Sequence, residues 1–321
     1  MPRALISASF GSSVWLVLLV QSLVSSSVTD KKPVSGGGGR RAGFLERTLI
    51  LLDVHTRSPV KVLNENFLSL QLDPAIISDG WVDFLSSKRL VTLARGLSPA
   101  VVRFGGKRTD FLRFENLKSK TRGPGPDYYL KNYEDDIVRS DIALDKMKGC
   151  RVASHPPMML ELQREKAAQM HQVLLKEQQD NIYSQTTITA RSLDKLYNFA
   201  DCAGLHLLFG LNALQRHAAP FWNGSNALSL LKYSASKKYN MSWELGNEPN
   251  GYGDLGVRGV NGSVLAEDHQ QLRRLLQSVR FYSRSALYGP NTGLPRKTHM
   301  PTLDGFLRAG GSMVDVVTWQ Q

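Results

Sequence analysis

The sequence predicts an α/β fold built as an incomplete (β/α)8 barrel, and three observations lead to this expectation. Buried-strand runs alternate with helical stretches from about residue 67 to residue 319, which favours parallel strands joined by right-handed crossovers. Several strands end on polar residues or glycine, as barrel strands do at the edge that carries the site. These ends account for about six strands, and they are Asp73, Gly105–Gly106, Asn212, Asn247–Glu248, Asn291 and Gln320.

An open doubly wound sheet is the rival architecture. It would commonly hold a nucleotide on a glycine-rich turn, and no G-x-G-x-x-G or G-x-x-x-x-G-K sequence stands between a strand and a helix. The seven histidines are scattered without zinc-ligand spacing. We therefore expect no nucleotide, no metal and no other cofactor.

Short apolar runs predict the strands in chain order. They are Thr48–Val54, Phe67–Leu72, Ala100–Phe104, Leu205–Leu211, Ser242–Leu245, Ala286–Tyr288 and Met313–Trp319. Apolar residues at intervals of three and four predict the helices between them. These are Trp81–Ala94, Met159–Glu177, Ala190–Ala200, Ala227–Tyr239, Glu267–Arg284 and Leu303–Ala309.

The alternation is interrupted at about residues 115–151. Gly123-Pro-Gly-Pro126 suits neither a helix nor a sheet, and charges cluster after it. We interpret this segment as an exposed insertion in a barrel domain that covers residues 48–321.

The N-terminus has the layout of a secretory signal peptide, which we place at residues 1–28. Arg3 precedes an apolar run at Val14–Val20, and small residues follow it. The run is too short to span a bilayer, so an uncleaved signal anchor is the weaker alternative. Residues 29–47 are basic and glycine-rich, which predicts a flexible leader. The expected location is secreted, in the extracellular matrix or at the cell surface.

A secreted chain permits two kinds of covalent modification. The two cysteines, Cys150 and Cys202, would close a loop of about fifty residues, and a disulfide there would contribute roughly 3–5 kcal/mol. Two buried thiols are the alternative. Three Asn-x-Ser sequons predict that at least one asparagine is glycosylated, and these are Asn223, Asn240 and Asn261.

The net charge of +12, with a pI near 9.7, favours anionic partners. Nucleic acid, an anionic membrane surface and sulfated polysaccharide all satisfy this condition. Charge alone does not choose among them.

The strand at Ser242–Leu245 ends on a turn whose side chains are of the kind that catalyse reactions. Gly246, Pro249 and Asn250 end the strand and leave Asn247 and Glu248 at its carboxyl edge. Glycoside hydrolysis needs a carboxylic acid in such a place to protonate the leaving oxygen, and a second carboxylate across the sugar. The alternative is a turn with a solvated glutamate. Glu244, inside the strand, is better explained as a buried, hydrogen-bonded carboxylate.

The stretch Trp243-Glu-Leu-Gly-Asn-Glu-Pro-Asn250 resembles the heparanase family, glycoside hydrolase family 79. Other segments agree, namely Thr92–Pro99, Arg103–Gly106, Tyr288–Pro290 and Val317–Trp319. Two further segments, Lys131–Arg139 and Leu231–Tyr239, are more similar to the family's non-hydrolytic paralogue. The resemblance implies that Glu248 is the proton donor at the end of the fourth barrel strand. It also implies cysteines paired at matching places, and excision of the insertion in active members.

The resemblance also implies a set of ligand-binding residues. Asp73 and Asn247 would contact sugar hydroxyls, and Arg296 would contact a sulfate or a carboxylate. Lys107, Arg108 and Lys297 lie on loops next to the same edge and would add positive charge. The alternative for Arg296 and Lys297 is a solvated loop. The partners implied are heparan sulfate or heparin, heparan sulfate proteoglycans and, through them, the membrane surface, with no nucleic acid.

Several residues depart from the pattern of the active family member. Lys107 stands where that member has threonine, Leu294 where it has glutamine, and Gln320–Gln321 where it has two histidines. Its basic cluster is weaker here, at residues 176–184. The family's nucleophile lies on a strand that this chain does not reach.

We therefore expect a protein that binds heparan sulfate without hydrolysing it. A retaining endo-β-glucuronidase is the first alternative. The second is an unstable fragment, because two uncovered sheet edges would leave the chain aggregated or held by another protein.

Overall fold

The computed structural model describes residues 4–10, 14–20, 60–116, 143–147, 150–216 and 221–320. The chain divides into two units, Met1–Asn64 and Glu65–Gln321. In the first unit, β1 (Ala4–Phe10) pairs with β2 (Val14–Val20) as an antiparallel hairpin. The expected strand at Thr48–Val54 and the expected leader lie outside the described residues, and the signal peptide stays a prediction.

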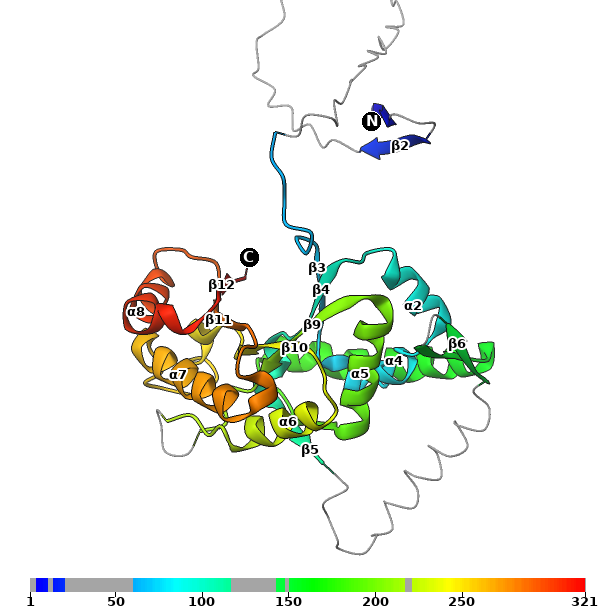
Figure 1. Ribbon diagram of the computed structural model, residues 1–321. Coiled ribbons are helices and arrows are strands. Elements are labelled where there is room, and N and C mark those ends of the chain that lie inside the picture. Colours follow the sequence, from blue (N-terminus) through cyan, green and yellow to red (C-terminus); the bar gives the residue numbers. More distant parts are fainter. Residues whose placement is uncertain are drawn as a thin grey trace, which may run out of the picture. The chain divides into compact units, whose positions relative to one another are not determined.

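The second unit is built on a six-stranded sheet in the order β12-β11-β10-β9-β4-β3, and every neighbouring pair is parallel (Figure 1). This confirms the incomplete barrel of about six strands, with β10 fourth in chain order. The strands are β3 (Ser69–Leu72), β4 (Ala100–Phe104), β9 (Leu205–Leu211), β10 (Met241–Leu245), β11 (Leu287–Thr292) and β12 (Val316–Trp319).

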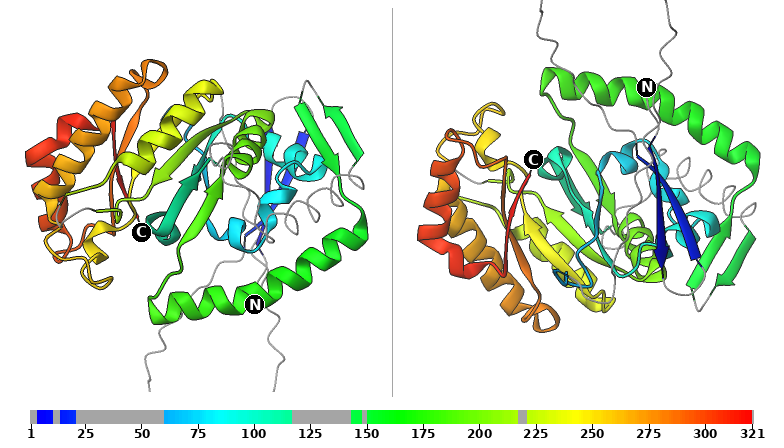
Figure 2. Two further views of the ribbon diagram at one scale, coloured as in Figure 1. Left: turned by 90° about the horizontal axis from the view of Figure 1, so that it is seen from below. Right: turned by 90° about the horizontal axis from the view of Figure 1, so that it is seen from above.

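Helices follow the strands, and α4 runs along the periphery of this unit (Figure 2). The α-helices are α1 (Ala75–Ser78), α2 (Lys88–Arg95), α4 (Pro157–Asp180), α5 (Ala190–Ala203), α6 (Ser225–Ser236), α7 (Gly262–Ser278) and α8 (Met300–Gly310). The 3-10 helices are η1 (Trp81–Phe84), η2 (Lys107–Phe111), η4 (Pro249–Gly251), η5 (Arg280–Tyr282) and η6 (Gly311–Met313). Within the described residues, no helix is both long enough and apolar enough to cross a membrane.

The predicted helix at Trp81–Ala94 is wrong in its middle, because the structure splits it into η1 and α2. The carbonyl of Ser86 accepts the backbone N–H of Ala153 at 2.7 Å, and Ser87 forms a parallel bridge with Ala153. Leu85 and Ser86 therefore form a turn and Ser87 is extended, which separates the two helices. Strand β11 is longer than predicted, since it continues to Thr292 beside β12.

Two small sheets were not predicted. Strand β5 (Leu112–Glu115) pairs in parallel with β8 (Thr186–Thr189), and β6 (Ala143–Met147) pairs antiparallel with β7 (Cys150–Ser154). Strands of four or five residues are too short to show a clear period in the sequence. Most of the insertion expected at residues 115–151 lies outside the described residues, and its exposure stays a prediction.

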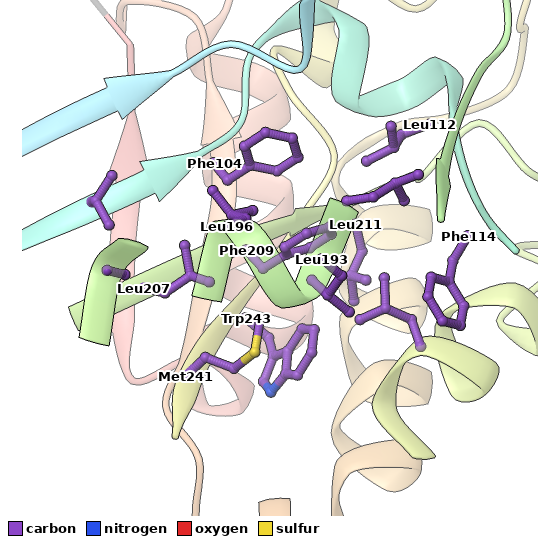
Figure 3. Close-up of a cluster of buried hydrophobic side chains, with 14 of the residues drawn as sticks. Phe104, Leu112, Phe114, Leu193, Leu196, Leu207, Phe209, Leu211, Met241 and Trp243 are labelled. Atoms are coloured by element: carbon purple, nitrogen blue, oxygen red, sulfur yellow. The ribbon is translucent and has the colours of Figure 1, made fainter. Parts of the chain in front are cut away.

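The hydrophobic core lies between the sheet and its helices, as Figure 3 shows. Phe104, Phe209 and Trp243 come from three successive strands of the sheet, with ring centroids 5.3 Å and 6.1 Å apart along the row. Tyr282 meets the indole ring of Trp243 edge-on at 5.0 Å. These buried aromatic rings tie β4, β9 and β10 to the outer layer.

The disulfide between Cys150 and Cys202 is present, with the two Cα atoms 5.6 Å apart. It joins β7 to α5 across 52 residues. The segment after the insertion is thereby tied to the barrel.

The other face of the sheet carries a buried ion pair. Arg103 on β4 donates from Nε to Glu244 on β10 at 2.6 Å, across the intervening strand β9. Arg103 also donates to Gln71 at 2.8 Å, and Thr318 on β12 donates to Glu244 at 3.2 Å. Burial raises the pKa of Glu244, and the charge of Arg103 opposes that shift. Glu244 is therefore a structural carboxylate, as the sequence suggested.

We predict that Glu244→Leu destabilises the domain by about 3–5 kcal/mol, because it leaves the Arg103 guanidinium without its counter-ion. The double variant Arg103→Met/Glu244→Leu should recover most of the loss, since no charge remains to be compensated. Urea unfolding of both variants measures this. A double variant no more stable than the single one would contradict the argument.

Candidate functional site

The turn that follows β10 holds Glu248 in an unusual backbone conformation. Gly246 has φ of 75°, and a Cβ atom there would collide with the Tyr252 hydroxyl. Glu248 itself has φ of 47° and ψ of 58°, a left-handed conformation that is uncommon outside glycine. Its N–H donates to the carbonyl of Asn291, and its carbonyl accepts from Gly251, both at 2.9 Å. The position of Glu248 is thus imposed by the fold.

The carboxylate of Glu248 is half-buried at this edge. Among the described residues it has no hydrogen-bond or ion-pair partner. A carboxylate held by its backbone but free at its oxygens can act on a ligand.

Asn247 is buried beside it, and its side chain is held in one orientation. Its Oδ1 accepts from Arg103 at 3.1 Å, from Asn291 at 3.3 Å and from Gln320 at 2.5 Å. Its Nδ2 is buried without a partner in the described part of the chain. Because Oδ1 is occupied, Asn247 presents a donor, and an acceptor such as a sugar oxygen would satisfy it.

Asp110 supports this turn from below, on η2. Its carboxylate accepts from the backbone N–H groups of Ala213 at 2.9 Å and Asn247 at 3.0 Å, and from the Tyr252 hydroxyl at 2.9 Å. Complete burial raises its pKa to about 7, although all three hydrogen bonds oppose the shift. Asp110 therefore connects η2, the loop after β9 and the turn after β10.

These residues line a cleft of about 490 Å³ at the carboxyl ends of the strands. Four of the residues singled out by the sequence line it, namely Lys107, Asn247, Glu248 and Arg296, together with the departures Leu294 and Gln320. Residues that strand-end reasoning did not find also line it, and they include Asp110, Tyr183, Asp254, Tyr252 and His299. They come from loops and 3-10 helices whose approach to β10 no local pattern indicates.

Three predicted ligand residues do not line the cleft. Arg108 is only 9% exposed, and it is occupied by Glu177 at 3.4 Å, Asp73 at 3.7 Å and the carbonyl of Leu174 at 2.8 Å. Asp73 accepts the N–H of Ala75, the first residue of α1, at 2.8 Å. Lys297 is exposed beyond the cleft wall. Their role in binding a ligand stays a prediction.

The three sequon asparagines lie on the surface of the domain. Asn240 and Asn261 are exposed, and Asn223 is half-buried. The Oδ1 atoms of Asn223 and Asn261 accept backbone N–H groups at 3.1 Å and 3.0 Å, which leaves Nδ2, the atom that carries a glycan. Glycosylation remains a prediction at all three positions.

Within the described residues, no group of three or more His, Cys, Asp or Glu side chains is placed to hold a metal ion. The cleft offers carboxylate, amide and cationic groups.

The sequence of this chain is similar to those of several known proteins. The profile described as "Glycosyl hydrolase family 79, N-terminal domain" matches residues 157–319. This chain belongs to glycosyl hydrolase family 79. It is 67% identical to inactive heparanase-2 of Homo sapiens, over 96% of this chain and 52% of that protein. It is 40% identical to heparanase of Bos taurus, over 84% of this chain and 47% of that protein.

The chain thus spans about half the length of the curated relatives it matches. A 4-O-α-L-rhamnosyl-β-D-glucuronidase from Fusarium oxysporum aligns over 81% of this chain and 45% of its own, with 12% identity and a TM-score of 0.43. A score this low leaves the fold assignment to the sheet topology and the family match.

Gln320 connects the end of the last strand to the cleft. Gln320, where the resemblance led us to expect a histidine, donates to Asn247 Oδ1. A glutamine amide does not titrate, so this contact stays the same at every pH. Gln320 therefore holds the Asn247 amide through a side chain whose protonation state does not change.

We predict that Asp110 makes the domain less stable as the pH rises. Because its folded-state pKa of about 7 lies above the ordinary 3.8, the unfolded chain releases this proton at lower pH. Stability therefore falls between pH about 4 and about 7, by up to about 4 kcal/mol at roughly 1.4 kcal/mol per pKa unit.

The test is urea unfolding at pH 5 and pH 8 for the wild type and for Asp110→Asn, which removes the titration. The variant should lose most of the difference between the two pH values. Asp304→Asn, at an exposed position on α8, should keep it. An unchanged difference in Asp110→Asn would contradict the prediction.

Proposed function

We propose that this chain is a heparanase-like protein that binds heparan sulfate in the cleft after β10 and does not hydrolyse it. The proposal that the chain does not hydrolyse heparan sulfate rests on the carboxyl groups that line the cleft. Besides Glu248, the described lining offers only Asp110 and Asp254. Asp110 is buried under three hydrogen bonds, and Asp254 follows Glu248 on the same loop. Retaining hydrolysis needs a carboxylate on the other side of the sugar.

Binding is supported by the donors that the cleft presents. Asn247 Nδ2 lacks a partner, and Lys107 and Arg296 line the cleft without an ion pair to any described residue. Amide and cationic donors suit hydroxyl, carboxylate and sulfate oxygens. The names of the relatives, heparanase and inactive heparanase-2, point to the same ligand class. Heparan sulfate proteoglycans would then bring the chain to the cell surface.

We also propose that the chain enters the secretory pathway and acts in the extracellular matrix or at the cell surface. The basic and apolar pattern of residues 1–28 supports this. So does the disulfide between Cys150 and Cys202, because such bonds persist mainly in oxidising compartments.

The first prediction from this proposal is that the purified chain leaves heparan sulfate at its original length. Size-exclusion chromatography of the polysaccharide after incubation at pH 5 and pH 7 measures this. Chain shortening by the wild type that disappears in Glu248→Gln would replace the proposal with its alternative, a retaining endo-β-glucuronidase.

The second prediction concerns binding in the cleft. Lys107→Ala/Arg296→Ala should weaken binding of a heparan sulfate oligosaccharide by roughly twofold to thirtyfold, since each of the two exposed ion pairs contributes about 0.2–1 kcal/mol. Isothermal titration calorimetry measures the change. Arg164→Ala/Lys166→Ala, at exposed positions on α4, removes the same charge away from the cleft, and this matched control should bind as the wild type does. Equal affinity of the double variant and the wild type would remove the cleft from the proposal.

A further inference from the structure

A second surface of the domain lies between α6 and β5, away from the turn that carries Glu248. Two cavities of about 520 Å³ and 460 Å³ meet there at Ser229, which lines both. We call them together the α6–β5 groove. Ser225, Ser229, Lys232 and Ser236 lie along one face of α6, and Arg113 and Phe114 belong to β5. A twelve-residue helix is about 18 Å long, so the groove suits a linear polymer.

The charges of the groove are all positive. Arg113 and Lys232 are exposed, and neither makes an ion pair with any residue that the structure describes. Arg216 also lines the groove, but its charge is paired with Asp268 at 2.6 Å. No aspartate or glutamate among the described residues lines either cavity. Glu115 follows Phe114 on β5 and lines neither of them.

The cleft after β10 has the opposite balance. Lys107 and Arg296 face three carboxyl groups there, those of Asp110, Glu248 and Asp254. A polymer with many negative charges is therefore attracted to the groove more strongly than to the cleft. The cleft binds through its two cations and the Asn247 amide, but its carboxyl groups weaken its attraction for a polyanion relative to the groove.

The walls of the groove are held together before any ligand arrives. Asn226 on α6 accepts from the N–H of Phe114 at 3.0 Å and donates to its carbonyl at 2.9 Å. Asn212 donates to the carbonyl of Leu112 at 3.0 Å. These amides fix β5 against α6 and place Arg113 beside the cavity. A preformed wall binds a ligand without the cost of ordering it.

We propose that the α6–β5 groove is a second binding site, for a linear sulfated or carboxylated polysaccharide, separate from the cleft. Arg113 would pair with a sulfate or carboxylate group, and Lys232 with a second one further along the chain. Serine hydroxyls line both cavities, and the Gln185 amide lines the larger one. These groups can form hydrogen bonds with sugar hydroxyls. Nucleic acid fits less well, because neither aromatic residue of the groove offers an open ring on which bases could stack. Phe114 is buried, and Tyr233 is half-buried with Lys237 over its ring.

The groove contains one of the three sequons, since Asn223 lines the first cavity. A glycan on Asn223 would compete with the proposed ligand. The test therefore uses the full chain secreted to a bacterial periplasm, which forms disulfides and adds no glycan at this sequon.

The experiment compares three double variants that each remove two positive charges. They are Arg113→Ala/Lys232→Ala in the groove, Lys107→Ala/Arg296→Ala in the cleft, and Arg164→Ala/Lys166→Ala at exposed positions on α4. All six side chains are on the surface, so folding should be unaffected. Binding of heparin is measured against salt concentration, with double-stranded DNA of equal charge as the competitor.

The groove variant should reduce the slope of log Kd against log salt by about two, one for each positive charge removed from the binding surface. The cleft variant should reduce it less, and the α4 variant should behave as the wild type does. Heparin oligosaccharide should also slow amide exchange in β5 of the wild type, the cleft variant and the α4 variant, but not of the groove variant.

Equal slopes for the groove and α4 variants would overturn the second site and leave the cleft proposal standing. Displacement of heparin by DNA as efficient as by heparin itself would overturn the assignment to a polysaccharide. Absence of heparin binding by the wild type would overturn both this inference and the proposed function.

Discussion

The ion pair between Arg103 and Glu244 is the constraint on which the sheet and the site both depend. It reaches from β4 to β10 over β9, where Gly210 stands in register with Glu244 and places no side chain in the way. Gly105 makes room as well, because a Cβ atom there would lie 2.8 Å from the Arg103 guanidinium carbon. Two charges out of water stabilise the fold only while they remain together. The ion pair therefore requires β4, β9 and β10 to keep their spacing.

The same guanidinium connects the sheet to the cleft. Its Nη2 donates to Asn247 Oδ1, so the orientation of the amide follows from the position of the ion pair. Asn291 and Gln320 add donors from the next two strands. Asp110 and Tyr252 hold the backbone N–H of Asn247 from the other side. The floor of the cleft is thus fixed in place, and Asn247 Nδ2 and the Glu248 carboxylate remain for a ligand, together with Lys107 and Arg296 on the cleft wall.

In our proposal, the cleft after β10 and the α6–β5 groove both bind a polyanion. The edges of the sheet are a separate feature of the domain. The sheet ends on β12 at one side and on β3 at the other. Trp319 and Val317 on β12 are 55% and 39% exposed. Such an edge offers backbone hydrogen-bonding groups and apolar side chains to another strand. Gln320, which lines the cleft, directly follows β12, whereas the groove is built from α6 and β5.

The sequence by itself determined the parts of this protein that follow from local burial. The apolar runs at Ala100–Phe104 and Leu205–Leu211 coincide with β4 and β9, because a buried strand needs apolar side chains on both faces. The turn after β10 could be predicted for a similar reason, because Gly246 and Pro249 end a strand whatever surrounds them. With two cysteines in the chain, only one disulfide pairing was possible.

Only the tertiary structure decided which of the charged groups are available. Arg108 was predicted to be a surface ligand, but Glu177 and Asp73 neutralise it. Asp110 carried no signal, yet it lies 137 residues before the backbone N–H that it binds. Arg113 and Lys232 are far apart in sequence and line adjoining cavities because Asn226 holds β5 against α6. Local patterns record the burial of a residue, whereas its charge partners depend on contacts between distant segments, which only the folded chain brings together.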